Sequence, residues 1–197
     1  MSYEVIGITG GIGAGKSVVS RILRLKGYPV YDCDSEARSL MESSEEILVA
    51  LQGRFGEECI LECGGLNRGY IASRVFNDAE ELTWLNALVH GAVREDVRDW
   101  VEAHASAGKE ILFVESAILY TSGLDKMCDR IWLVTAPEEL RLERAMQRGG
   151  ASEEDLRRRI ESQRMEFDSL PAGKVSEIEN SCTSLLDRVE ELLATPR

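Results

Sequence analysis

Residues 10–17 read Gly-Gly-Ile-Gly-Ala-Gly-Lys-Ser and fit the pattern G-x-x-x-x-G-K-[ST] in full. The segment before them, YEVIGIT at residues 3–9, is short, apolar and rich in β-branched side chains, as is typical of a strand. After the lysine and serine, apolar residues recur at near-helical spacing until Gly27, with Pro29 just beyond. The sequence therefore predicts a strand that turns sharply through a glycine-rich loop into a helix.

The residue types of this loop have a physical reason. Glycine adopts backbone angles that a side chain forbids, and a loop without side chains can surround phosphate oxygens with N–H groups. The helix that follows points its unpaired amides and the positive end of its dipole at the same anion. Lys16 adds a point charge for the β- and γ-phosphates, and the Ser17 hydroxyl is suited to binding Mg²⁺. The alternative is a turn that binds nothing; the flanking strand and helix favour a site for a nucleoside triphosphate.

Such a loop identifies the nucleotide but not its use, and three classes compete. A GTPase would usually carry an N-K-x-D motif and a D-x-x-G stretch, and the sequence contains neither in the expected places. A motor ATPase would need a hydrophobic strand that ends in Asp-Glu. The nearest segment, EILFVES at residues 110–116, ends in Glu115-Ser116, which could still place a carboxylate near the metal. A chain of 197 residues is better sized for a small-molecule kinase.

A second apolar segment, YPVYDCDSEARSL at residues 28–40, begins as a short strand and then presents Asp32-Cys33-Asp34 where a helix is expected. Parallel strands end at the same edge of the sheet as the phosphate loop, so Asp32 is predicted to lie beside the γ-phosphate. A carboxylate there can accept the proton of an attacking hydroxyl and help to position the metal. The simpler expectation for Asp34 or Ser35 is that one of them caps the helix.

Residues 136–163, APEELRLERAMQRGGASEEDLRRRIESQ, form a basic region with two helical patterns around a break at 149–152. Ser152 is expected to cap the second helix. This pattern predicts a helical hairpin that closes over the triphosphate. Arg144 and Arg148 are four residues apart, on one helix face, and could neutralise charge on the transferring phosphoryl group. Arg157–Arg159 are more simply interpreted as partners of neighbouring glutamates.

The overall composition excludes several other roles. Lys and Arg number 23 against 35 Asp and Glu, a net charge of −12, which disfavours nucleic-acid binding. Apolar runs such as 111–114 and 131–134 are too short to span a bilayer, and no secretory signal is visible, so we expect a cytoplasmic protein. The five cysteines lack zinc-site spacing and are expected to be reduced thiols without a metal role.

With these features the chain resembles the dephospho-coenzyme A kinases, which use ATP to phosphorylate the 3′-hydroxyl of the dephospho-CoA ribose in the last step of CoA biosynthesis. The similarity covers almost the whole chain. It is strongest in GITGGIGAGKS at the start and in VYDCDSEAR at residues 30–38. Weaker agreement follows in GGLNRGYIASRVF, WLNALVHGAV and RAMQRGGASEEDLRRRIESQ.

The resemblance implies a set of site residues. Asp32 becomes the base for the ribose hydroxyl, Arg144 and Arg148 become lid arginines, and Ser17 becomes the Mg²⁺ ligand. The implied nucleotide contacts are Gly10, Gly11, Gly13, Ala14, Gly15, Lys16, Ser17 and Val18, with Asn180 near the adenine. The implied acceptor contacts are Asp32, Asp34, Arg68, Asn86 and His90.

Several positions depart from the family pattern. Gly91 follows His90 where the family usually has proline. The family's Asp-x-Pro-Leu-Leu-Phe-Glu stretch has Glu115 for the aspartate, Ala117 for the proline and Thr121 for the final glutamate. These departures concern the acceptor and adenine regions and leave the phosphate loop unchanged. His90 lies on a largely apolar helical pattern, so its roles as core residue and as acceptor contact both stay open.

Strand-like segments near residues 3–9, 29–32, 111–115 and 130–135, with a weaker one at 175–179, alternate with helical patterns. This alternation predicts an α/β fold of the P-loop NTPase type, a parallel sheet flanked by helices. We expect a monomer with a nucleotide-binding core (1–35, 109–140 and 166–197), a helical acceptor subdomain (36–108) and a lid (141–165). Trp84, Trp100 and Trp132 are expected in the core. Two alternatives remain: a kinase for a nucleoside, shikimate-like or sugar acceptor, and a nucleotide-binding regulator without turnover.

Overall fold

The computed structural model describes residues 3–181 and 184–195, and the chain divides into two compact units. The core unit comprises Met1–Asp32 and Trp100–Arg197, and the helical unit comprises Cys33–Asp99. The sequence predicts this second segment as 36–108. It ends earlier because the end of the long helix α5 (Ala79–Ser106) belongs to the core unit, where the Trp100 ring meets Tyr31 edge to face at 5.5 Å.

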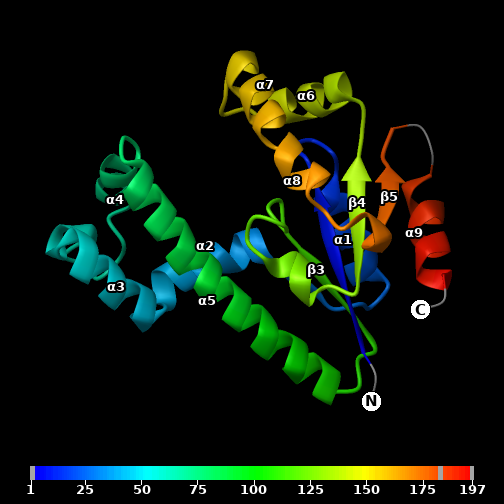
Figure 1. Cartoon of the computed structure of the whole chain (residues 1–197), viewed down its shortest axis with the longest axis horizontal. Helices are drawn as coiled ribbons and strands as arrows, with labels where there is room; N and C mark the ends of the chain where they lie inside the picture. The colour runs from blue at the N-terminus through cyan, green and yellow to red at the C-terminus, as the bar shows by residue number, and fades with distance from the viewer. Residues whose placement is uncertain (1–2, 182–183, 196–197) are drawn as a thin grey trace. The chain divides into compact units, whose positions relative to one another are not determined.

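In the described part of the core unit, five parallel strands form one sheet in the order β2-β3-β1-β4-β5. The strands are β1 (Glu4–Gly10), β2 (Val30–Asp32), β3 (Ile111–Glu115), β4 (Arg130–Thr135) and β5 (Val175–Glu179). Figure 1 shows β1 and β4 within the sheet, with α1 and α9 beside it. The arrangement confirms the predicted α/β fold, including the weak fifth strand.

Helices α1 (Lys16–Leu25) and α9 (Leu185–Ala194) pack on the sheet through apolar side chains. Val19 and Leu23 of α1 are fully buried against the strands. Trp132 of β4 is also fully buried and packs against Phe113 of β3, so its predicted place in the core is confirmed. Burial of the central strands from both sides explains why their sequences read as continuous apolar runs.

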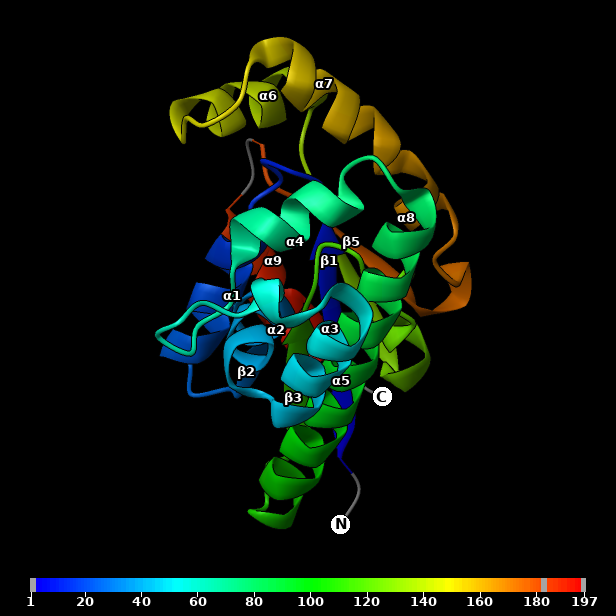
Figure 2. The ribbon, with the colours of Figure 1, turned by 90° about the vertical axis from the view of Figure 1, so that its left-hand side faces the viewer.

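The predicted hairpin is formed by α6 (Glu138–Gln147) and α7 (Glu153–Ser162), which we call the lid hairpin; the short helix α8 (Arg164–Asp168) follows it. Figures 1 and 2 show α6 and α7 side by side beyond the carboxyl end of β4. Gly149 and Gly150 have φ angles of 73° and 92° and reverse the chain between the helices. Ser152 caps α7 by accepting a hydrogen bond from the Asp155 N–H, as predicted.

The helical unit contains α2 (Cys33–Ser43), α3 (Glu45–Phe55), α4 (Arg68–Val75), the first part of α5 and the 3-10 turn Glu57–Cys59. Its own apolar core includes Ile47, Leu51, Phe55 and Ile71. The half-buried Trp84 packs edge to face on Phe55 at 5.5 Å, as expected of a core residue.

One capping prediction is wrong. Strand β2 runs directly into α2, which begins at Cys33, so Asp34 lies within the first turn and neither Asp34 nor Ser35 precedes the helix. A carboxylate in that turn still interacts favourably with the helix dipole.

Two expectations from composition can be compared with the described residues. Within residues 3–181 and 184–195, none of the helices has the length and apolar character needed to cross a bilayer. Cys59, Cys63 and Cys128 are free thiols, and burial raises the pKa of the Cys128 thiol to about 12. Cys182 lies outside the described residues.

Candidate active site

The phosphate loop, residues 10–15, joins β1 to α1 and depends on glycine, as Gly13 and Gly15 show. Gly13 and Gly15 have φ angles of 76° and 104°, which other residues rarely adopt. A Cβ at Gly13 would lie 2.1 Å from the Arg141 carbonyl oxygen, and one at Gly15 would lie 2.1 Å from Asn180 Nδ2. Both the backbone angles and the close neighbours therefore require glycine.

The carbonyl groups of this loop are held by protein donors. The acceptor–donor pairs are Gly10 O with Lys16 Nζ at 2.7 Å, Gly11 O with Ala14 N at 3.1 Å, Ile12 O with Arg141 Nε at 3.0 Å, Gly13 O with Arg144 Nη1 at 3.4 Å, and Ala14 O with Asn180 Nδ2 at 2.8 Å. A trans peptide points its N–H opposite to its C=O. Holding these carbonyls therefore turns the N–H groups of Gly11, Gly13 and Gly15 the other way, into the arrangement that an anion needs.

Two of the residues implied by the family pattern converge on this loop. Asn180 follows β5, and its backbone oxygen accepts a second hydrogen bond from Arg144, at 3.1 Å from Nη2. Arg144 thus links the loop to the end of β5. Arg148, the C-cap residue of α6, has an exposed side chain, to which no residue in the described part of the chain is hydrogen-bonded.

Lys16 and Ser17 begin α1, directly behind the loop. The half-buried Lys16 side chain folds back to the loop entrance, where its ammonium group donates to Gly10 O. Ser17 is exposed in the first turn of α1, as is Val18 beside it. The helix therefore presents an ammonium group, a hydroxyl and the positive end of its dipole at one place.

Asp32 and Glu115 form a pair of carboxyl groups at the strand ends. They occupy paired positions in β2 and β3, so their side chains leave the same face of the sheet, from strands about 4.8 Å apart. Glu115 is also paired with Ile8 of β1, the strand that leads into the phosphate loop. The structure thus brings Asp32 to the sheet edge at which the sequence predicts it.

The two carboxyl groups have different surroundings. Glu115 is buried, with 9% of its surface exposed, whereas Asp32 is half-buried. Burial raises the pKa of Glu115, and the charge of Asp32 acts in the same direction; Ser20, Lys16 and Arg24 oppose the rise. Ionisation of the buried partner is therefore disfavoured, which leaves Asp32 as the more accessible carboxylate.

Four of the predicted acceptor contacts, Asp34, Arg68, Asn86 and His90, lie in the helical unit. Asp34 and Arg68 are exposed near the starts of α2 and α4, and Arg68 forms an ion pair with Glu42 at 2.5 Å. Asn86 and His90 are one turn apart on α5, with Asn86 exposed and His90 half-buried. Burial, together with the charge of Arg94, lowers the pKa of His90, so the neutral imidazole is favoured.

Sequence reasoning assigned no role to three residues that contact the loops of this site: Arg141, Gln163 and Glu166. Gln163 Oε1 accepts from the Ile12 N–H at 2.9 Å. The buried Glu166 accepts from the N–H of Tyr120 at 2.5 Å, and from the N–H and hydroxyl of Thr121 at 3.0 and 2.6 Å. Thr121 stands where the family pattern has a glutamate, so a carboxylate reaches this loop from α8 instead.

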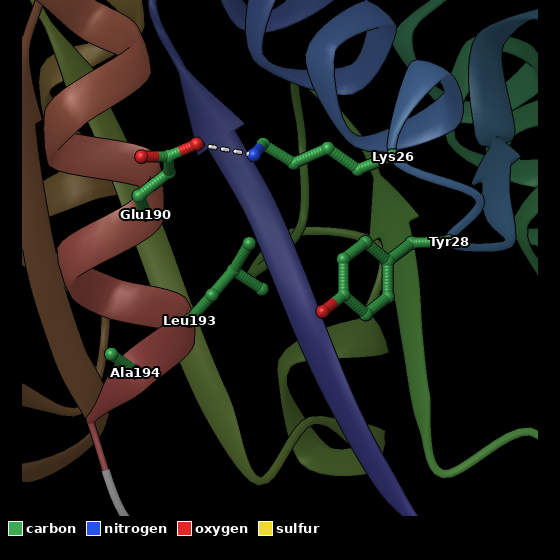
Figure 3. A pocket seen from close by; sticks show the side chains of 5 residues that line it. All are labelled: Lys26, Tyr28, Glu190, Leu193 and Ala194. Atoms are coloured by element: carbon green, nitrogen blue, oxygen red, sulfur yellow. Dashed lines mark hydrogen bonds and ion pairs between the residues drawn. The ribbon is translucent and has the colours of Figure 1, made fainter.

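A surface pocket of about 470 Å³ lies elsewhere in the core unit (Figure 3). It is lined by Lys26, Tyr28, Glu190, Leu193 and Ala194, and Lys26 and Glu190 form an ion pair at 2.5 Å. Lys26 follows the last residue of α1, whereas the phosphate loop precedes the first. The pocket is therefore at the opposite end of α1 from the proposed chemistry.

A glycine-rich phosphate loop between a strand and a helix, two carboxyl groups at the neighbouring strand ends and a helical hairpin whose arginines contact the loop define a P-loop kinase. The comparisons with known proteins give the family. The model of the dephospho-CoA kinase family matches residues 4–184, and the chain belongs to that family.

Individual relatives agree with this assignment. The dephospho-CoA kinase of Porphyromonas gingivalis is 40% identical over 193 residues, covering 98% of this chain and 94% of the relative. A crystal structure of a Thermus thermophilus protein has a TM-score of 0.76 at 35% identity, covering 98% and 95% of the two chains. The dephospho-CoA kinase structure from Campylobacter jejuni, at 21% identity, has a TM-score of 0.68 over 96% and 94% of the chains, which shows the shared fold.

Proposed function

We propose that the protein transfers the γ-phosphoryl group of ATP to the 3′-hydroxyl of dephospho-CoA and releases CoA and ADP. The observation that carries this proposal is the position of Asp32, paired with Glu115 beside the strand that leads into the phosphate loop. A carboxylate there can meet an acceptor hydroxyl at the terminal phosphate.

The triphosphate is bound by the outward N–H groups of the loop, by Lys16 and by the start of α1. Arg144 is committed to the carbonyls of Gly13 and Asn180, so its proposed part is to keep the loop in shape. The exposed Arg148 is the lid arginine that supplies positive charge to the transferring phosphoryl group.

The donor atoms present fit Mg²⁺. Among the described residues, no group of three or more His, Cys, Asp or Glu side chains could cage a metal ion. Mg²⁺ is usually held by one or two protein oxygens together with phosphate oxygens and water, and a hydroxyl beside a carboxylate matches that habit. Ser17 would hold the ion directly, with Asp32 or Glu115 nearby. Bound there, Mg²⁺ would neutralise charge on the β- and γ-phosphates.

In the reaction, Asp32 orients the acceptor hydroxyl and accepts its proton as the oxygen attacks the γ-phosphorus in line with the departing ADP. Burial raises the pKa of the neighbouring Glu115, so its ionised form is less favoured there than that of an exposed glutamate. Closure of the lid hairpin excludes water, which would otherwise compete with the acceptor.

The helical unit is proposed to bind dephospho-CoA. Exposed Arg68 suits the phosphate oxygens of this acceptor, because a guanidinium group recognises them in a fixed fork geometry. Asn86 and His90, one turn apart on α5, can supply neutral hydrogen bonds, since burial holds the imidazole uncharged.

The test is ADP formation with and without dephospho-CoA, for the wild type and Asp32→Asn. We expect the acceptor to stimulate turnover in the wild type, and the substitution to lower it by about 10²–10⁴-fold with little change in ATP affinity. Exposed Asp168 on α8 provides a matched control, Asp168→Asn. Near-normal turnover of Asp32→Asn would refute the base assignment. Preference for a nucleoside, shikimate or sugar acceptor, or nucleotide binding without stimulated turnover, would refute the proposed function.

A further inference from the structure

Ile12 is held to the lid region from three sides. Its N–H donates to Gln163 Oε1 at 2.9 Å, and its carbonyl accepts from Arg141 Nε at 3.0 Å. Its side chain packs against the apolar cluster inside the lid hairpin, formed by Leu142, Ala145, Leu156 and Ile160. The middle of the phosphate loop is therefore attached to both stems of the hairpin.

Arg141 approaches the loop so closely that a side chain at either of two loop glycines would collide with it. A Cβ at Gly11 would lie 2.0 Å from the Arg141 Nη2 atom, and one at Gly13 would lie 2.1 Å from the Arg141 carbonyl oxygen. The backbone of Gly11, unlike that of Gly13, lies outside the left-handed range, so at Gly11 the obstacle to a side chain is Arg141 itself.

The position of Arg141 is not explained by stability. Its Nη2 atom is buried, and no protein oxygen among the described residues accepts a hydrogen bond from it. Burial lowers the pKa of this guanidinium, which means that the charged form is poorly solvated there. A partly buried cation with an unsatisfied donor destabilises a fold. The buried position of Arg141 therefore needs a functional explanation.

We propose that Arg141 is a positioning residue that keeps the phosphate loop in its anion-binding shape. Its hydrogen bond holds the peptide between Ile12 and Gly13 with the carbonyl toward α6 and the Gly13 N–H toward the phosphates. The loop is thereby ordered before ATP arrives, and binding does not have to supply the ordering free energy. The inference rests on the proposed binding of ATP by this loop.

The experiment measures ADP affinity by titration calorimetry, without acceptor, for Arg141→Ala, Gly11→Ala and the double variant. We expect Arg141→Ala to weaken binding about tenfold, the equivalent of about 1.4 kcal/mol. Thermal unfolding should change little, because a poorly satisfied cation is removed. Gly11→Ala should weaken binding similarly by displacing the guanidinium, and it should have almost no further effect once Arg141 is alanine. Arg158→Ala, which removes an exposed lid arginine paired with Asp155, serves as the control.

Two results would overturn the proposal: wild-type affinity in Arg141→Ala, or independent, multiplying effects of the two substitutions. If Arg141→Ala fails to fold, Gly11→Ala decides alone, and unchanged affinity in that variant overturns the proposal. Because ADP binding is measured without acceptor, the outcome is separate from the identity of the acceptor. Failure of dephospho-CoA to stimulate turnover would refute the proposed function and leave this inference standing.

Discussion

Substitution of Glu166 tests how strongly α8, which follows the lid hairpin, is held to the loop after β3. Its buried carboxylate accepts three hydrogen bonds from the loop after β3: one from Tyr120 to Oε1, and two from Thr121 to Oε2. The substitution Glu166→Gln keeps the shape of the side chain. It replaces one of the two acceptor oxygens with an NH₂ group.

The expected loss follows from the geometry. If the glutamine oxygen keeps both Thr121 donors, the glutamine NH₂ group takes the place of the Oε1 atom that lies 2.5 Å from the Tyr120 nitrogen. Two hydrogen-bond donors then face each other there. One hydrogen bond to a charged group, worth about 1.5–3 kcal/mol, is then lost, and the other two become neutral. In the opposite orientation the Tyr120 bond is kept, the bond from the Thr121 N–H is lost, and the Thr121 hydroxyl must turn to accept from the NH₂ group. We therefore expect Glu166→Gln to lower the free energy of unfolding by about 3 kcal/mol.

Urea unfolding followed by circular dichroism measures this change, with the midpoint shifted and the slope unchanged. In a chain of this size the loss corresponds to about 6–12 °C in Tm. Glu154→Gln is the matched control, because Glu154 is exposed on α7. An unfolding free energy for Glu166→Gln within about 0.5 kcal/mol of the wild type would show that the three hydrogen bonds do not hold this loop.

Three further perturbations test other parts of the structure. Arg130→Met removes the guanidinium group that donates to both carboxylate oxygens of Glu4, whose side chain is only 5% exposed. We expect the free energy of unfolding in urea to fall by about 3–5 kcal/mol, and a fall below about 1 kcal/mol would contradict the importance of this ion pair. Gly15→Ala forces a side chain onto a φ angle of 104° in the phosphate loop and should weaken ADP binding at least about 100-fold by calorimetry; wild-type affinity would rule out the loop as the binding site. Burial lowers the pKa of His90 below its ordinary 6.5, so the unfolded chain binds the proton more readily, and the unfolding free energy should fall as the pH drops below about 6.5. The same slope in His90→Gln would assign this pH dependence to other groups.

The fold could be predicted because its signals are local. Each strand is a short apolar, β-branched run, and turn-forming residues mark its limits in the sequence. Pro29 precedes β2, and Gly108 precedes β3. The helix cap at Ser152 was equally visible, since it depends on one side chain and an amide three residues away. The prediction that Asp34 or Ser35 caps α2 was wrong because α2 begins at Cys33, directly after the last residue of β2.

The candidate site divides in the same way. The phosphate loop is continuous in the sequence, and Asp32 follows from the rule that parallel strands end at a common edge. The hydrogen bonds of Arg141 and Gln163 join residues 129 and 151 positions apart, and both end on the backbone of Ile12. A backbone group is present in every residue, so no pattern of residue types marks it as a partner.

Arg144 and Asn180 show a further limit of reasoning from motifs. A motif suggests contacts with a ligand, yet in the structure these side chains satisfy Gly13 O and Ala14 O of the phosphate loop. An anion site of backbone amides needs its carbonyls turned away from the anion, and each of these carbonyls needs a hydrogen-bond donor from the protein. Some side chains near a nucleotide site therefore serve to hydrogen-bond the carbonyls of the loop, whether or not a ligand is present.

This requirement also explains how a chain with a net charge of −12 can hold a triphosphate. Exposed carboxylates more than about 8 Å away are largely screened at physiological ionic strength. Lys16, Arg141 and Arg144, in contrast, are in direct hydrogen-bond contact with the loop. These three cationic side chains, which donate to the loop carbonyls, therefore raise the local electrostatic potential at the proposed phosphate site. An extended polyanion would lie over many acidic surface groups and be repelled, whereas a compact triphosphate bound at the loop would cover few of them.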